Sequence, residues 1–258
     1  MKDFDNYLGV PSRVIDSPVE AICFDAVGTL FQVRGSVGQI YGEWASRYGF
    51  HSGTKLPVQN KIQKAFLEVF RDQGPMVFLE RQNISIQQLE RQWWRELVRK
   101  TFAQVGQFPR IEEFFESIYE FFATSAAWKL EPGATETLFR LQKAGKQLAV
   151  ISNFDSRLCK LLEELDIRQY FDKVIVSSLA QVSKPSPLIF HSALGAMGRH
   201  PERTVHVGDD LKEDFEGARS AGLRGILYDP KDRFREKVQG LRIKKLLDVL
   251  LIFPVGVC

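Results

Sequence analysis

Polar side chains follow several short apolar runs of the sequence, at the points where buried strands would end. The positions are Asp25, Ser152 with Asn153, Lys184, and Asp209 and Asp210 with Asp214 behind them. A carboxylate can act as a nucleophile or a metal ligand, and a hydroxyl or an ammonium group can bind a phosphoryl oxygen. Since the carboxyl ends of parallel strands meet at one edge of a sheet, we expect these side chains in one crevice.

Carboxylates held close together repel one another and raise each other's pKa values unless a cation compensates their charge. Lys184 supplies one positive charge against Asp25, Asp209 and Asp214. Oxygen ligands of this kind favour Mg²⁺, which takes one or two carboxylates together with waters and phosphate oxygens. The sequence therefore predicts a Mg²⁺ site that receives a small phosphorylated substrate.

A change in hydrophobic period marks the elements that would position these groups. The apolar run 19–24 predicts a buried strand, and amphipathic helical segments follow at 36–48, 57–73, 85–105 and 111–123. Beyond residue 128 the two patterns alternate, with helices at 132–144, 156–165, 187–197, 212–221 and 243–252 and strands at 147–151, 173–176, 204–207 and 225–228.

Alternating helices and strands are typical of a parallel sheet with helical crossovers. We therefore predict an α/β fold with a Rossmann-like parallel sheet core flanked by helices, formed by residues 1–32 and 125–258. The stretch 33–124 is expected to form an all-helical cap inserted after the first core strand.

The composition is that of a globular protein, with 258 residues, a formal net charge of +3 and 44% hydrophobic residues. Cys23, Cys159 and Cys258 are scattered, so we expect neither disulfides nor a zinc site. No apolar run approaches the roughly 20 residues of a membrane span, and the first residues lack the pattern of a secretory signal. We expect a cytoplasmic protein without membrane or nucleic-acid partners, since the basic excess in 231–245 is typical of a solvated face.

Four sequence motifs in this order resemble those of the haloacid dehalogenase superfamily of hydrolases. They are FDAVGTL (24–30), ISN (151–153), SKP (183–185) and VGDDLKED (207–214) with the trailing GARSAG (217–222). Each motif alone is weak, but the ordered set covers most of the chain. The resemblance implies a Mg²⁺-dependent phosphohydrolase whose helical cap selects the substrate.

The resemblance also implies a role for each candidate residue. Asp25 would be the nucleophile that forms an aspartyl-phosphate, Ser152 would bind a phosphoryl oxygen, and Lys184 would neutralise charge and hold Asp25. The Mg²⁺ ligands would be Asp25, Asp209 and the main-chain carbonyl of Val27, with Asn153, Asp210 and Asp214 in supporting roles.

Val27 departs from the phosphatase pattern, in which an aspartate two residues after the nucleophile protonates the leaving group. Valine cannot transfer a proton, and positioned acid–base catalysis is typically worth about 10² to 10⁴ in rate. We therefore expect weak hydrolysis of alkyl phosphates. An acid supplied by the cap is one remedy, and Glu43, Arg47 and His51 are the candidates.

Two other functions fit parts of the same pattern. The loss of the acid at Val27 favours a catalytically vestigial protein that binds a ligand, or a partner protein through its cap. The string DAVGTL also permits a 2-haloacid dehalogenase that forms an ester on Asp25. Asp209 and Asp214 count against the dehalogenase, because that reaction needs no metal.

Overall fold

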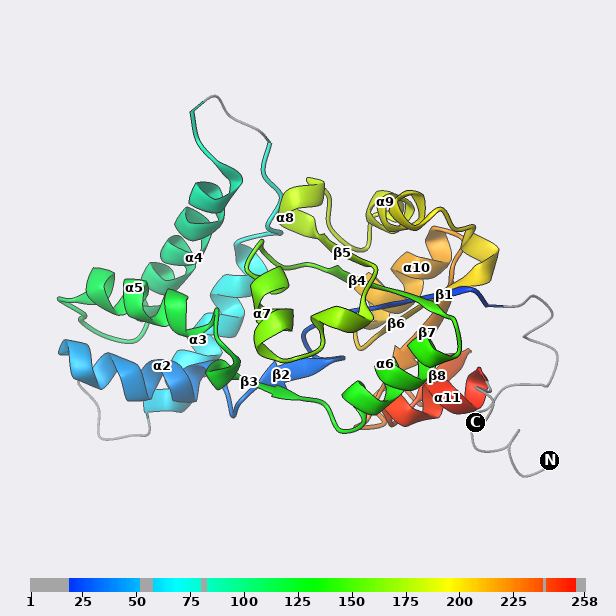
Figure 1. Cartoon of the computed structure of the whole chain (residues 1–258). Helices are drawn as coiled ribbons and strands as arrows, with labels where there is room; N and C mark the ends of the chain where they lie inside the picture. Colours follow the sequence, from blue (N-terminus) through cyan, green and yellow to red (C-terminus); the bar gives the residue numbers. More distant parts are fainter. Residues whose placement is uncertain (1–18, 52–57, 80–82, 239, 254–258) are drawn as a thin grey trace.

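The computed structural model describes residues 19–51, 58–79, 83–238 and 240–253. Its core is a six-stranded parallel sheet in the order β5-β4-β1-β6-β7-β8 (Figure 1). The strands are β1 (Ala21–Phe24), β4 (Gln147–Ser152), β5 (Lys173–Val176), β6 (Thr204–Gly208), β7 (Arg224–Tyr228) and β8 (Leu241–Ile243). Because β1 lies between β4 and β6, the end of β1 is at the centre of the sheet edge.

Helices cover both faces of this sheet, because successive strand side chains point to opposite sides. Ile22 and Phe24 of β1 belong to the hydrophobic cluster that includes α6, α7 and α11, whereas Ala21 and Cys23 pack with α9 and α10. The core helices are α6 (Ala134–Lys143), α7 (Leu158–Glu164), α8 (Ser177–Ala180), α9 (Pro187–Met197), α10 (Gly217–Ser220) and α11 (Val249–Ile252). The predicted Rossmann-like sheet flanked by helices is confirmed.

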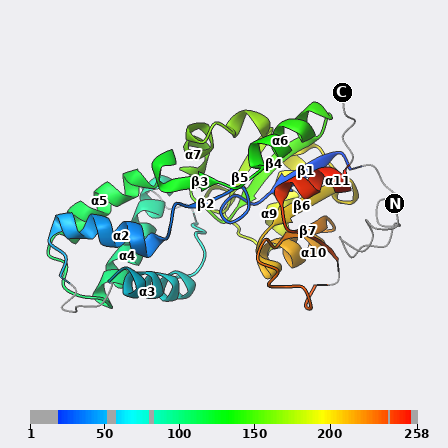
Figure 2. The same cartoon turned by 90° about the horizontal axis from the view of Figure 1, so that it is seen from below.

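The cap is a separate helical body that a two-stranded stem joins to the core (Figure 2). The antiparallel strands β2 (Phe31–Val33) and β3 (Trp128–Leu130) form the stem. Between them lie α2 (Val37–Ala45), α3 (Val58–Asp72), α4 (Ile86–Ala103) and α5 (Ile111–Phe121). The predicted helical insertion is therefore confirmed, while its limits at residues 33 and 124 stay a prediction.

Aromatic packing gives the cap a hydrophobic core of its own. The Tyr41 ring of α2 contacts Phe66, Phe102 and Phe114 with ring centroids 5.6 to 6.0 Å apart. Ser85 begins α4 with a capping box, in which its hydroxyl accepts a hydrogen bond from the main-chain nitrogen of Gln88. Within the described ranges, no helix combines the length and apolarity that crossing a bilayer requires.

Some predicted elements were wrong in detail. The helix expected at 243–252 begins only at Val249, because β8 extends to Ile243 and the 3₁₀ turn Leu246–Asp248 follows. The Asp248 carboxylate accepts hydrogen bonds from the main-chain nitrogens of Lys244 and Lys245 and so fixes this turn. The strands β2 and β3 were not predicted, since three residues are too few to show an alternating pattern.

Candidate active site

The end of β1 places Asp25 at the middle of the sheet edge, where its main-chain nitrogen donates to the carbonyl of Val207 at 2.9 Å. The chain then turns sharply at Gly28, whose φ is +97°. A Cβ atom at Gly28 would lie 2.4 Å from Oδ1 of Asp209. Glycine is therefore required at this position, since a side chain would displace the carboxylate.

Lys184 joins two of the buried carboxylates. Its Nζ atom donates to Oδ1 of Asp25 and to Oδ1 of Asp214, both at 2.6 Å. Asn153 positions this lysine through its main chain, because Oδ1 accepts from the Lys184 nitrogen at 2.8 Å and Nδ2 donates to its carbonyl at 3.0 Å. Burial opposes the charge of Lys184, but the two carboxylates outweigh it and raise the pKa of the ammonium group.

Asp214 is held by donors on both of its oxygens. Oδ1 also contacts Nε2 of His206 at 2.9 Å, and Oδ2 accepts from the main-chain nitrogen of Asp210 at 3.0 Å. Burial favours the neutral acid, yet Lys184 and His206 outweigh burial and hold the pKa of Asp214 well below its usual range. Asp214 is therefore an ionised, fixed positioning residue.

Asp210 and Gly208 place Asp214 at the end of β6. The Asp210 carboxylate accepts from the main-chain nitrogens of Lys212 and Glu213 at 2.8 and 2.7 Å, so it caps the π-helical turn Leu211–Glu216. A Cβ at Gly208 would lie 2.1 Å from Cγ of Asp214. The helix 212–221 expected from the sequence is thus a π-helical turn followed by the short α10.

Asp209 carries the least compensated charge of the group. Burial, together with the charges of Asp25 and Asp214, raises the pKa of Asp209 to about 7. Its nearest cation is Nη2 of Arg233 at 3.8 Å. Burial also raises the pKa of Asp25, although Lys184 opposes the effect. An added cation would relieve both carboxyl groups.

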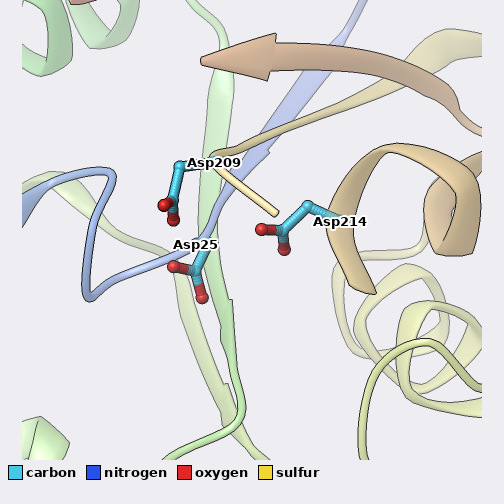
Figure 3. Close-up of side chains that lie close together, drawn as sticks. All are labelled: Asp25, Asp209 and Asp214. Atoms are coloured by element: carbon cyan, nitrogen blue, oxygen red, sulfur yellow. The ribbon is translucent and has the colours of Figure 1, made fainter. Parts of the chain in front are cut away.

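The three carboxylates Asp25, Asp209 and Asp214 could accommodate such a cation. One oxygen atom of each lies within 4.8 Å of the others, and the three side chains point toward one another (Figure 3). Asp214 already accepts donors on both oxygens, whereas Asp209 has no hydrogen-bond donor within the described ranges. Hard oxygen donors with unmet charge fit Mg²⁺, for which Asp25 and Asp209 are the available ligands.

A cavity of about 780 Å³ opens over these groups, between the sheet edge and the cap. It is lined by the eight residues to which the family resemblance assigns a role, namely Asp25, Val27, Ser152, Asn153, Lys184, Asp209, Asp210 and Asp214. On the cap side it is lined by α3 and the segment after it, including Phe70, Arg71 and Met76. The structure therefore brings the predicted residues together at one place.

The cap residues suggested as replacement acids do not line this cavity. Glu43 accepts a hydrogen bond from Gln39 at 3.3 Å on the exposed face of α2, and the Arg47 guanidinium lies over the ring of Trp44. His51 pairs with Gln107 in an isolated bridge. That expectation was wrong, because α3 rather than α2 lines the cavity over the carboxylates.

Sequence reasoning missed two contributors to the site. Arg71 lines the cavity from the last turn of α3, and Glu213 accepts from Asn153 at 2.9 Å. His206, at the strand end beside Gly208, is a fully buried residue packed against Asp214. One face of α3 carries Leu67, Phe70 and Arg71, because these residues are spaced three and four positions apart. This spacing could have identified the side of the cap that lines the cavity.

Comparison with known proteins agrees with this fold. The family model described as haloacid dehalogenase-like hydrolase matches residues 19–222. Haloacid dehalogenase-like hydrolase domain-containing protein 3 of Xenopus laevis is 34% identical over 214 residues, which are 81% of this chain and 84% of that protein. The chain belongs to the haloacid dehalogenase-like hydrolase family.

Another relative matches a shorter part of the chain. Glyceraldehyde 3-phosphate phosphatase of Methanothermobacter thermautotrophicus is 38% identical over 128 residues, 48% of this chain and 55% of that protein.

Solved structures share the whole fold at low sequence identity. A haloacid dehalogenase-type phosphatase from Thermococcus onnurineus superposes with a TM-score of 0.63 at 20% identity, covering 92% of this chain and 99% of the other. The structure of the hydrolase YfnB from Bacillus subtilis, bound to magnesium, has a TM-score of 0.64 at 18% identity and covers 92% of this chain and 99% of the other. L-2-haloacid dehalogenase from Xanthobacter autotrophicus has a TM-score of 0.65 at 17% identity, covering 92% of this chain and 100% of the other. The fold alone therefore does not separate phosphatase from dehalogenase.

Proposed function

We propose that this hydrolase is a Mg²⁺-dependent phosphohydrolase that cleaves a small phosphorylated compound through an aspartyl-phosphate on Asp25. The observation that carries the proposal is the Lys184 ammonium group, which lies 2.6 Å from oxygens of both Asp25 and Asp214 beside the weakly compensated Asp209. The phosphatase name of the Methanothermobacter relative supports the same substrate class.

The chain's own groups would act in two displacement steps. In the first, a carboxylate oxygen of Asp25 attacks phosphorus, and the bond to the leaving oxygen breaks with its electron pair on that oxygen. Lys184 orients the nucleophile through its contact with Oδ1 of Asp25. The Ser152 hydroxyl, at the end of β4, donates to a phosphoryl oxygen.

In the second step, water attacks the phosphorus of the aspartyl-phosphate and loses its proton to solvent. The bond from phosphorus to Asp25 breaks, which releases inorganic phosphate and restores the carboxylate. Mg²⁺ held by Asp25, Asp209 and the main-chain carbonyl of Val27 would neutralise charge on the phosphoryl oxygens. Asn153, Asp210 and Asp214 position Lys184 and the loop that carries Asp209.

Two alternatives remain open to the same test. A vestigial protein that binds a ligand, or a partner through the cap, is favoured by Val27, which lines the cavity without an ionisable group. A 2-haloacid dehalogenase is favoured by the likeness to the Xanthobacter structure. The weakly compensated Asp209 favours the metal-dependent reaction over the dehalogenase. The cytoplasmic location stays a prediction.

The proposal is tested with p-nitrophenyl phosphate, whose leaving group departs without needing a proton. We expect hydrolysis that requires Mg²⁺ and is lost in Asp25→Asn. The matched control Asp166→Asn, at an exposed aspartate after α7, should keep the wild-type rate. Val27→Asp should raise the rate on an alkyl phosphate by about 10² to 10⁴.

Absence of turnover in both wild type and Val27→Asp, with Mg²⁺ binding measured by calorimetry, would support the vestigial binding protein instead. Chloride release from 2-chloropropionate without metal would support the dehalogenase.

A further inference from the structure

A second, apolar cavity of about 380 Å³ adjoins the site cavity and extends into the cap. We call it the cap chamber. Residues that line both spaces are Val27, Leu67, Phe70, Met76 and Asn153. Val27 therefore lies where the cap chamber meets the cavity that contains the nucleophile.

Aromatic side chains dominate the walls of the cap chamber. They come from the cap, the stem and the core, and include Phe66, Trp94, Phe115, Tyr119, Trp128 and Phe154. Small-molecule pockets of about 300 to 1,000 Å³ are typically apolar with a few placed polar groups. Aromatic walls favour a ring in the ligand, because rings pack well edge to face or in offset stacks.

The charged group in the chamber wall is already neutralised. Arg157 donates to Asp155 from Nε at 3.0 Å and from Nη2 at 2.6 Å, and Nη1 donates to the carbonyl of Tyr119 at 2.8 Å. Its guanidinium carbon lies 3.7 Å from the centroid of the Tyr119 ring. The chamber is thus suited to an uncharged, apolar group rather than to a sugar or a second phosphate.

The leaving-group side of the site also lacks a proton donor of suitable acidity. Among the described residues that line the cap chamber, none is an aspartate, a glutamate or a histidine. Burial raises the pKa of Tyr119 to about 12 and that of Tyr41 further. A leaving oxygen directed into the cap chamber finds no such donor and departs as an anion, which a phenol-type oxygen does far more readily than an alcohol.

We propose that the substrates of this site are aryl phosphate monoesters whose apolar ring occupies the cap chamber. This inference rests on the proposed phosphohydrolase function and specifies its substrate class. Asp25 attacks phosphorus, the bond from phosphorus to the aryl oxygen breaks, and the electron pair leaves on the aryl oxide. The aryl oxide takes a proton from solvent after release, so no acid is needed at Val27.

Three phosphate esters separate ring size from leaving-group acidity. Cyclohexyl and phenyl phosphate have rings of similar size, but only the phenol is acidic, so we expect kcat for the cyclohexyl ester to be lower by about 10² or more. Phenyl and 2-naphthyl phosphate have leaving groups of similar acidity, but the second ring fills more of the chamber. We expect KM for the naphthyl ester to be about tenfold lower.

Leu67→Gln tests the chamber directly, since Leu67 lines both cavities and is 50% exposed, so its replacement leaves the cap core intact. KM for 2-naphthyl phosphate should rise about tenfold, and this rise should exceed any change in KM for acetyl phosphate, which has no ring. The matched control is Leu251→Gln, at a leucine of α11 that is 49% exposed and lines neither cavity. It should behave as wild type towards both substrates.

The two proposals fail in different ways. Asp25-dependent turnover of acetyl phosphate, with equal KM values for phenyl and naphthyl esters and no effect of Leu67→Gln, would overturn the aryl inference alone. Efficient hydrolysis of cyclohexyl phosphate by the wild type would do the same. No Asp25-dependent turnover of any of these phosphates would overturn the phosphohydrolase function and the inference with it.

Discussion

At the scale of single residues, the site is organised by how each carboxylate is compensated. Asp214 is surrounded by donors, and Asp25 shares Lys184 with it. At Asp209, burial and the charges of Asp25 and Asp214 outweigh the cations Lys184 and Arg233, so this carboxyl group binds its proton more tightly. The negative charges of the three carboxylates are thus balanced unequally. Asp214, whose charge is balanced, fits a positioning role, whereas Asp25 and Asp209 fit the role of cation ligands.

Asp209 should make both stability and metal binding depend on pH. Its pKa of about 7 in the folded protein lies above the ordinary aspartate value of 3.8, so its stabilising contribution is present below pH 3.8 and is lost as pH rises through 7. Mg²⁺ binds the ionised form, so MgCl₂ should raise the melting temperature more at pH 8 than at pH 6. At a free Mg²⁺ concentration of 100 times Kd, binding stabilises the folded protein by about 2.7 kcal/mol.

Asp209→Asn is the decisive variant in this thermal-shift experiment. It should melt at a higher temperature than wild type in the absence of metal at pH 8, and it should lose the response to MgCl₂. Asp166→Asn serves as the control. An undiminished Mg²⁺ response in Asp209→Asn would show that Asp209 is not a metal ligand.

At the scale of secondary-structure elements, the sequence was most informative where a strand is buried and followed by turn residues. Asp25 and Ser152 could be placed because β1 and β4 each contain an apolar run of four residues, and Asp209 could be placed because Val205 and Val207 precede it in β6. Parallel pairing then requires their ends to meet at one edge. The short strands β2, β3 and β8 escaped detection, because each has three residues.

The sequence did not show which cap helix lines the cavity, and this failure has a different physical cause. Periodicity shows that α2 and α3 are amphipathic, but it does not show which helix packs over the sheet edge. Contacts distant in sequence decide that, so Glu43 on α2 was a plausible donor by sequence and Arg71 on α3 lines the cavity. The role of Asn153 in holding Lys184 was equally invisible, since 31 residues separate them.

The turn after β1 provides a prediction at this scale. Gly28 and Gly145 both have positive φ values, +97° and +72°, but a Cβ at Gly145 meets nothing within 4 Å. Alanine at Gly145 should therefore cost only backbone strain, about 1 kcal/mol. Alanine at Gly28 would also place its Cβ 2.4 Å from Oδ1 of Asp209 and should therefore weaken Mg²⁺ binding measured by calorimetry. Equal Mg²⁺ affinity in the two variants would contradict this account of the turn.

At the scale of the whole molecule, a short core segment after β4 connects the cap to the site. Asp155 accepts from Nε1 of Trp94 at 2.6 Å, and Ser156 donates to the buried Glu90 of α4 from its main-chain nitrogen at 2.9 Å and its hydroxyl at 2.5 Å. Arg157, in the same segment, lines the cap chamber. The residues that hold the cap in place thus also shape the proposed substrate pocket.

Glu90→Ala should therefore weaken both the fold and substrate binding. It leaves the part-buried Ser156 donors without their acceptor, and the loss of such a partner typically costs about 1 to 3 kcal/mol. The free energy of unfolding in urea should fall by this amount, and KM for 2-naphthyl phosphate should rise, since the chamber wall shifts with the cap. The control is Glu96→Ala on the same helix, whose exposed pair with Lys100 at 3.6 Å is worth about 0.5 kcal/mol or less. Equal stabilities and equal KM values for Glu90→Ala and Glu96→Ala would mean that the contact between Glu90 and Ser156 does not position the cap.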